Sequence, residues 1–504
     1  MAGDKKTNAN TPENIPIYVA DPIDDSHDHS APFKTEVVPE EVPEVTPEEL
    51  TLSDLGGGGD ASIPVIDDST FGGRSEVKKY LFLGLGVVAA IVIFILVFLF
   101  IRSLFGPERK KVTLEYWGIW EDVAVMKPII DEYTRLNPEI KINYVKQDPR
   151  DYREKLLTRG KEGRGPDIFR FHNTWLPSII ELAAPLPQSA MSSAEFKKTF
   201  YEVMQDDLFS ENAYYGIPLG IDGLVLVYNT DLFKKVGIAS PPQTWDDVLA
   251  DADALRVEDV DKNLLTSGIS LGTAENIEHF SDIFAWMLLQ NGGDLTSLSN
   301  PEGVEVLKNY RQFAEPQLNF WNESLPNNIT AFAQGKVAMI IVPSWQILEI
   351  LAQNPDIKMK ATVLPILPGT QQLSLATYWV EGVSKTSKNQ EEAWKFLVYL
   401  SQKDTMTKLY QEQSKVRPFG VAYSRVDLRD TLLTHPYLGA VLEQAPHMKS
   451  LPLAMRTYDN GLNDDSITYI RDAINATIKG VSYQTALQTA AQGVQQVLQK
   501  YKIQ

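Results

Sequence analysis

A run of 22 uncharged residues from Tyr80 to Ile101, YLFLGLGVVAAIVIFILVFLFI, is the strongest constraint on this 504-residue chain. A helix rises about 1.5 Å per residue, so the run would extend about 33 Å, enough to cross a hydrocarbon core of about 30 Å. The run is too long for the apolar region of a cleaved signal peptide, and its leader is also unusually long. We therefore predict a transmembrane helix over 78–104 that contacts the lipid bilayer through 80–101.

Charge separates the two sides of this run. Residues 1–77 contain 17 Asp/Glu and 4 Lys/Arg, whereas the rest of the chain contains 49 acidic and 43 basic groups. A segment so rich in Pro, Glu, Asp, Ser and Gly buries too little apolar surface to offset chain entropy, so 1–77 is predicted to be a disordered acidic tail. Neither part is basic, which argues against a nucleic-acid partner. The chain has no cysteine, which excludes disulfides, thiol nucleophiles and cysteine metal sites.

Strand and helix patterns alternate from 112 to 504, after a short linker at 105–111. The stretch VTLEYW alternates apolar and polar residues as a half-buried strand does, and Thr244 with Asp247 three positions later fits a capping box at a helix start. Such alternation predicts an α/β fold. Because 393 residues exceed what one compact core accommodates, we expect two lobes.

Patterns typical of enzymes are weak in this sequence. GISLG around Ser270 fits G-x-S-x-G, but that motif needs the serine on a turn between strand and helix, and here it lies among strand-like residues. DVDKN at 259–263 lacks the glycine and glutamate of a calcium loop. We predict no catalytic, metal or cofactor site. The sequence does not exclude a pair of carboxylates for glycoside hydrolysis, because the distance between them in the folded chain decides whether they can act together.

Seven stretches follow one another in an order that a known family shares: VTLEYWGIW, IIDEYTRLNPEIKINYV, GPDIFRFHNTW, YYGIPLGIDGLVLVYNTDLFKKVGI, PPQTWDDVL, AFAQGKVAMIIVPSW and ATYWVEGVSKTSKNQEEAWKFLVYL. Through them, 112–504 resembles the extracellular solute-binding proteins of ABC importers, specifically the maltose-binding-protein-like, carbohydrate-type group. The resemblance implies a periplasmic-binding-protein fold, in which two α/β lobes close by a hinge on a solute in the cleft between them. It also implies that the chain crosses between lobes near 220–224, 363–367 and 411–417.

The same resemblance implies solute contacts in the loops after the strands and at the crossings. The residues it indicates are Trp117, Trp120, His172, Asn173, Trp175, Asp222, Trp345, Tyr378 and Trp379. Indole and phenol rings stack on the apolar C–H faces of sugars, while carboxylates and amides accept hydrogen bonds from their hydroxyls. A structural alternative for Asp222 is a carboxylate that caps backbone amides at the hinge. We expect Asp222 to matter more for binding than for folding.

The resemblance implies a non-enzymatic receptor that captures a solute, in our interpretation a sugar or oligosaccharide, and delivers it to an ABC permease in the same membrane. Flanking charges do not set the membrane orientation. A solute receptor must face outward, however, so we expect the acidic tail in the cytoplasm and the binding domain outside. The alternatives are a membrane-tethered solute sensor, a receptor for a polyamine, peptide or phosphate ester, and a membrane-bound hydrolase.

Overall fold

The computed structural model describes two parts of the chain, residues 85–98 and 111–503. The first part is helical and falls within the span predicted to cross the membrane. In these two parts, no helix has both the length and the apolar character that a membrane crossing requires. The predicted disordered tail at 1–77 and all but the last residue of the linker at 105–111 lie outside the described residues.

A five-stranded sheet with the strand order β2-β1-β3-β13-β6 organises one half of the body at 111–503. Its strands are β1 (Val112–Gly118), β2 (Ile140–Lys146), β3 (Ile168–His172), β6 (Ile217–Pro218) and β13 (Trp379–Val383). Strand β1 is parallel to β2 and β3, while β13 is antiparallel to β3 and β6. Helix α2 (Val123–Leu136) connects β1 to β2, so the chain opens with a β-α-β unit. We call this sheet and its helices lobe 1.

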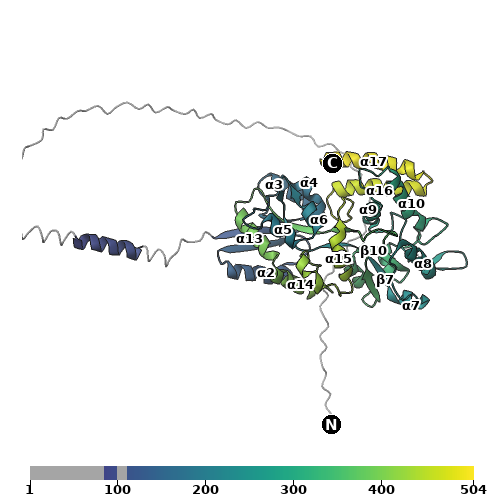
Figure 1. Cartoon of the computed structure of the whole chain (residues 1–504), viewed down its shortest axis with the longest axis horizontal. Coiled ribbons are helices and arrows are strands. Elements are labelled where there is room, and N and C mark those ends of the chain that lie inside the picture. The colour runs from purple at the N-terminus through teal and green to yellow at the C-terminus, as the bar shows by residue number, and fades with distance from the viewer. Residues whose placement is uncertain (1–84, 99–110, 504) are drawn as a thin grey trace, which may run out of the picture. The chain divides into compact units, whose positions relative to one another are not determined.

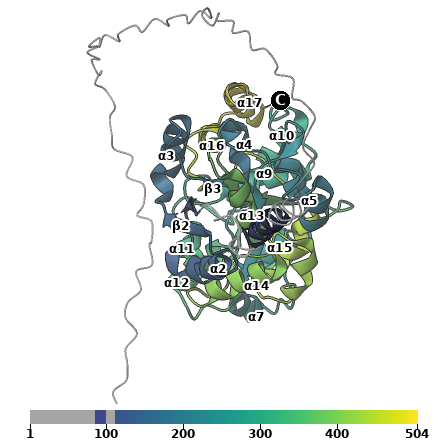
Figure 2. The same cartoon turned by 90° about the vertical axis from the view of Figure 1, so that its left-hand side faces the viewer.

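The helices of lobe 1 come from two distant stretches of the sequence. They are α3 (Pro149–Lys161), η1 (Asn173–Trp175), α4 (Leu176–Ile179), α5 (Ser193–Thr199), α6 (Glu202–Asp207), α13 (Gln390–Leu400), α14 (Lys403–Ser414) and η3 (Val426–Thr431), with the small hairpin β4 (Phe209–Ser210) and β5 (Ala213–Tyr214). Helix α14 packs against α2, and the two lie side by side in both views (Figure 1 and Figure 2). Late segments of the chain therefore complete a lobe that early segments begin.

A second sheet, with the order β14-β12-β7-β10-β9-β8 and β11 paired to β7, forms lobe 2. Its strands are β7 (Asp222–Asn229), β8 (Val257–Glu258), β9 (Leu264–Ile269), β10 (Val337–Pro343), β11 (Met359–Thr362), β12 (Ser374–Thr377) and β14 (Met448–Lys449). The LVLV run at 224–227 is buried along its whole length. A strand that is covered on both faces has this continuous apolar composition, which is why β7 is central.

The helices of lobe 2 cover this sheet and include the C-terminal pair. They are α7 (Thr230–Val236), α8 (Trp245–Leu255), α9 (Phe280–Gln290), α10 (Pro301–Arg311), η2 (Gln312–Ala314), α11 (Asn328–Ala333), α12 (Gln346–Gln353), α15 (Gly439–Gln444), η4 (Ala445–His447), α16 (Leu462–Ile478) and α17 (Tyr483–Lys500). The predicted capping box is confirmed, because Thr244 and Asp247 exchange hydrogen bonds at the start of α8. Figure 1 shows α8, α10 and α17 on the side of the body away from α2 and α13.

The chain passes directly from one sheet to the other twice. The first passage lies between Pro218 at the end of β6 and Asp222 at the start of β7. The second is shorter, because β12 of lobe 2 ends at Thr377 and β13 of lobe 1 begins at Trp379. Tyr378 is therefore the one residue between two strands that belong to different sheets.

A third passage lies between η3, which packs on α5 of lobe 1, and α15, which packs on β7 of lobe 2. The sequence analysis placed the second and third passages earlier, near 363–367 and 411–417. Strand β12 holds the chain in lobe 2 through Thr377, and α14 holds it in lobe 1 through Ser414. Regular elements thus keep the chain in each lobe beyond the positions that the resemblance implied for these two crossings.

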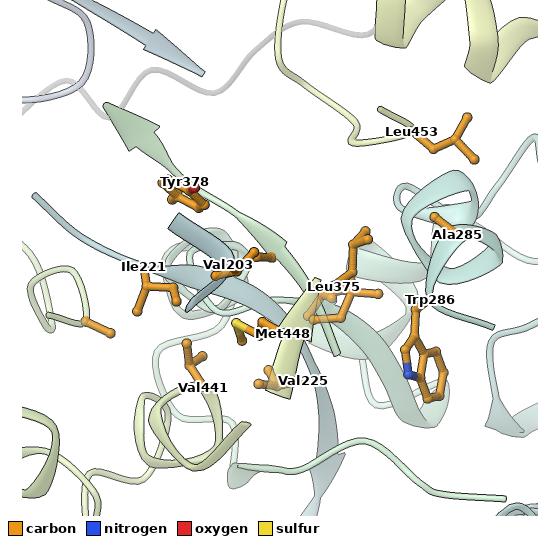
Figure 3. Close-up of a cluster of buried hydrophobic side chains, with 14 of the residues drawn as sticks. Val203, Ile221, Val225, Ala285, Trp286, Leu375, Tyr378, Val441, Met448 and Leu453 are labelled. Carbon is orange, nitrogen blue, oxygen red and sulfur yellow. The ribbon is translucent and has the colours of Figure 1, made fainter. Parts of the chain in front are cut away.

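The core is continuous across the second passage. Figure 3 shows Tyr378 in one cluster of buried side chains with Val203 of α6, Ile221 of the first passage, and Leu375 and Met448 of lobe 2. All five side chains are buried. The junction between the lobes is therefore packed around the passage residue itself.

Candidate functional site

Trp379, the first residue of β13, is the centre of an aromatic cluster beside the second passage. Its ring centroid lies 5.4 Å from that of Trp120, 5.4 Å from that of Trp175 and 5.2 Å from that of His172, each in an edge-to-face arrangement. Trp175 and His172 are buried, whereas Trp379 is partly exposed and Trp120 is 37% exposed. The structure thus brings four of the predicted residues together and leaves two of their rings accessible for stacking. Such ring contacts fix geometry and are each worth about 0.5–1.5 kcal/mol beyond area burial.

His172 contacts Trp379 in this cluster, and both of its ring nitrogens are occupied by protein partners. Its Nδ1 lies 2.8 Å from Thr174 Oγ1 and its Nε2 lies 2.8 Å from Thr377 Oγ1, so both ring nitrogens have protein partners. Burial lowers the pKa of His172 to about 3, which keeps the imidazole neutral at physiological pH. The ring therefore orients Trp379 and the end of β12 and has no free nitrogen for a solute.

Asn173 and Tyr378 meet in a hydrogen-bond network on Asp207, at the end of α6. Asp207 Oδ2 accepts from the Tyr378 hydroxyl at 2.7 Å, from Ser450 Oγ at 2.7 Å and from Asn173 Nδ2 at 2.9 Å. Burial raises the pKa of Asp207 to about 6 although these three donors act in the opposite direction. Sequence analysis named Asn173 and Tyr378 but missed Asp207, because nothing local in MQDDLF marks its distant partners.

Trp345 lies in lobe 2, at the N-terminal end of α12, and has different neighbours. The guanidinium carbon of Arg456 lies 5.5 Å from the Trp345 ring centroid, and Arg456 forms ion pairs with Glu278 at 2.6 Å and Glu349 at 2.7 Å. The ring of buried His279 lies edge-on to Trp345 at 5.4 Å. Trp345 is thus a partly exposed ring whose cationic neighbour is neutralised by two carboxylates.

The segment 455–461, which sequence analysis did not select, connects these two groups of rings. Arg456 reaches Trp345, and the Tyr458 ring centroid lies 6.1 Å from that of Trp120 in lobe 1. Arg456, Tyr458 and Asn460 have φ angles of +56°, +55° and +42°. Non-glycine residues in this region each cost roughly 1–2 kcal/mol, and they persist where surrounding contacts over-determine them. The DNG turn sequence at 459–461 was the only local signal.

Asp222 begins β7, and its carboxylate is fully engaged. One oxygen accepts from the amides of Gly223 at 2.7 Å and Ser344 at 3.0 Å; the other accepts from Ser344 Oγ at 2.9 Å and the Trp345 amide at 3.0 Å. The Ser344 and Trp345 donors lie where α12 begins, and the dipole of a helix favours a negative charge at that end. Burial nevertheless raises the pKa of Asp222 to about 6. These contacts are those of the structural alternative, in which the carboxylate caps backbone amides.

Trp117 faces away from the cluster around Trp379. It is 7% exposed and lies under α3, with Lys155 Nζ 5.1 Å and the Arg159 guanidinium carbon 5.9 Å from its ring centroid. The two cations cover the ring, as cation–π geometry favours. The structure therefore does not bring Trp117 together with the other predicted rings.

The catalytic alternatives gain no support from the geometry. Ser270 follows β9, is completely buried, and has no hydrogen-bond partner for its hydroxyl among the described residues, so no neighbouring base would activate it. In the same parts of the chain, no group of three or more His, Asp or Glu side chains has the spacing to hold a metal ion. Two surface hollows, one beside β11 and α15 and one beside α5 and α6, include none of the nine predicted residues in their linings.

Comparison with known proteins places this architecture in context. Residues 128–423 match the family model of the bacterial extracellular solute-binding protein. A protein of Brucella abortus described as a binding protein is 28% identical over 294 residues, which cover 55% of this chain and 68% of the relative. A multiple sugar-binding protein of Streptococcus mutans is 23% identical over 336 residues, which cover 60% of this chain and 74% of the relative.

Solved structures share the architecture more broadly than the sequence. The sugar-binding protein MalE of Xanthomonas citri matches with a TM-score of 0.65 at 19% identity, covering 78% of this chain and 98% of MalE. At this identity the likeness concerns the fold. The body at 111–503 therefore has the α/β periplasmic-binding-protein fold of MalE-like structures.

Proposed function

Because this chain belongs to the family of bacterial extracellular solute-binding proteins, which are not enzymes, we propose that it captures a sugar or oligosaccharide between its two lobes and delivers it to an ABC importer. The observation that supports this most strongly is the aromatic cluster around Trp379, at the residue where the chain changes sheets. Hinge closure moves the two lobes about such a passage, so a solute bound there would contact both lobes when they close.

The chemistry of the accessible groups favours an uncharged, ring-shaped solute. Trp120, Trp379 and Tyr458 offer partly exposed ring surfaces, and Trp345 offers another from lobe 2. The cation nearest to Trp345 is already paired with two carboxylates. A phosphate ester would call for a free arginine cluster, and a polyamine for unpaired carboxylates. The names of the Streptococcus mutans relative and of MalE, which specify sugar binding, support the same choice.

We further propose that the chain is anchored by the apolar run from 80 to 101, with its acidic tail in the cytoplasm and its binding domain outside. The length and uncharged character of the run support this proposal. Tethering raises the concentration of the receptor at its permease without any new contact. Alkaline carbonate extraction of membranes should leave the full-length chain in the pellet, and its release into the supernatant would contradict the anchor.

A thermal-shift screen of the full-length chain against sugars, oligosaccharides, polyamines, peptides and phosphate esters tests the solute class. A ligand at 100 times its dissociation constant stabilises the folded state by about 2.7 kcal/mol, which gives a clear shift in melting temperature. We expect one or more sugars to shift the melt. A shift by a polyamine, peptide or phosphate ester, with none by any sugar, would overturn the carbohydrate assignment. Conversion of a bound glycan into products would instead identify the hydrolase alternative.

A further inference from the structure

The three side chains that donate to Asp207 come from segments that are far apart in the sequence and meet at the second passage. Asn173 follows β3 of lobe 1, Tyr378 separates β12 from β13, and Ser450 follows β14 of lobe 2. A hydrogen bond of 3.0 Å from Asn173 Nδ2 to Ser450 Oγ closes the group. One carboxylate oxygen therefore joins the two lobes through the residue that connects their sheets.

The backbone of the passage is held by the same group. The Asn173 amide donates to the Tyr378 carbonyl at 3.0 Å, and the Tyr378 amide donates to Asn173 Oδ1 at 3.2 Å. Trp379 follows directly, so its Cα position is fixed by the hydrogen bonds of its neighbour. Hydrogen bonds to a charged acceptor are roughly twice as strong as those between neutral groups, so the bonds to the Asp207 carboxylate are the strongest in the network.

We infer that Asp207 is a positioning residue for the solute site: its carboxylate holds Tyr378, and through Tyr378 the ring of Trp379, in the arrangement that receives the solute. This inference rests on the proposed function and extends it by assigning the residue that couples the hinge to the aromatic surface. Asp207 itself need not touch the solute, because it acts on Trp379 through Tyr378, the preceding residue in the chain.

The surroundings of Asp207 make its ionisation a usable probe. Charged or titratable side chains on α6 and on the elements packed against it are Glu195, Lys197, Lys198, Glu202, Asp206, His447 and Lys449. Asp206 is the charged neighbour that adds to the effect of burial in raising the pKa of Asp207, which reaches about 6. A protonated carboxyl is a weaker acceptor than a carboxylate, so the hold on Tyr378 should weaken as the pH falls through this value.

The test compares the full-length wild type with Asp207→Asn and with the matched control Asp206→Asn, which alters the exposed neighbouring carboxylate. Hydrogen exchange, measured without solute, should become faster at the Asn173 and Tyr378 amides in Asp207→Asn and stay unchanged in the control. Affinity for the sugar found in the screen should fall about tenfold at pH 7.5 in Asp207→Asn. Between pH 7.5 and pH 5 the wild type should lose affinity several-fold, whereas Asp207→Asn should show a flatter profile. The control should lose affinity at a lower pH than the wild type, because Asp206→Asn removes a charge that raises the pKa of Asp207.

Each other outcome has a distinct meaning. Wild-type exchange and affinity in Asp207→Asn would overturn the inference, and so would faster exchange with unchanged affinity and pH profile, because the residue would then be structural only. Absence of binding by the wild type to every sugar would refute the proposed function, while the exchange measurement would still decide whether Asp207 holds the passage. If Asp207→Asn does not fold, Ser450→Ala removes one donor only and must shift exchange and affinity in the same direction; wild-type behaviour of that variant would overturn the inference.

Discussion

The two direct passages between the lobes each have a partly buried carboxyl group, yet the two groups are used differently. Burial raises the pKa of both Asp222, at the first passage, and Asp207, at the second, to about 6. All four donors to Asp222 lie in lobe 2, and three of them are backbone amides. The donors to Asp207 are side chains from both lobes and from the passage itself. Equal burial and equal pKa therefore do not imply equal roles.

The comparison assigns stability to the first passage and solute positioning to the second. Backbone amides at the start of α12 stay in place whether or not the lobes move, so a carboxylate bound to them anchors one lobe. Side chains of different lobes that meet at the junction move relative to one another when the lobes move. A group that ties such side chains together is therefore sensitive to hinge closure.

The largest effect we predict is on binding, from removal of the central ring at the second passage. Trp379→Ala should weaken the affinity for the sugar by about 30- to 100-fold, roughly 2–3 kcal/mol, because the variant loses the stacking surface and the edge contacts that orient Trp120. Isothermal titration of the full-length chain measures the change. The control is Trp117→Phe, beneath α3, which should bind within threefold of wild type; an equal loss in both variants would remove the distinction between the two rings.

At the first passage, the predicted effect is on stability. Asp222→Ala should lower the free energy of unfolding by about 2 kcal/mol, because it leaves the amides of Ser344 and Trp345 without their acceptor, while sugar affinity should stay within threefold of wild type. Chemical denaturation and titration of the same samples give both numbers. Asp231→Ala, which changes an exposed aspartate on α7, should alter neither. This prediction reverses our expectation from sequence that Asp222 matters more for binding, and a selective loss of affinity would restore that expectation.

A smaller effect concerns pH and treats the two carboxyl groups alike. A carboxyl whose pKa is raised by folding binds its proton more tightly in the folded state, so its stabilising contribution is complete below pH 4 and is lost as the pH rises to about 6. Relative to the double variant Asp207→Asn/Asp222→Asn, the wild type should lose unfolding free energy over this window, on the order of 1 kcal/mol per group. Denaturation at intervals from pH 4 to pH 7 measures the difference, and parallel curves would show that neither group titrates there.

Sequence patterns were sufficient for the fold and for part of the site. Alternating strands and helices and the capping box at Thr244 are local features, determined by neighbours in the chain, and they were predicted correctly. The positions of Trp120, Trp175 and Trp379 came from resemblance, and the fold does bring their rings together. Whether these rings contact a solute stays a prediction.

Features that depend on three-dimensional contacts were missed. Asp207 has partners 34, 171 and 243 positions away, and no periodicity encodes such distances. Tyr458 lies on a segment of left-handed residues that contacts Trp120 of lobe 1 and Trp345 of lobe 2, and both of these partners are remote in the sequence. The resemblance implied a second passage near 363–367, whereas β11 and β12, on either side of that stretch, both pair with β7 of lobe 2.

A crystal structure of the full-length chain with the sugar identified by the screen would test the central claim most directly. We predict that a sugar ring lies against Trp379 and Trp120, with Asp207 bound to Tyr378 and the Asp222 carboxylate still bound to Ser344 and Trp345. A structure in which Asp222 has released these amides to bind the sugar, with no contact between the sugar and the Trp379 ring, would contradict the roles assigned to the two passages.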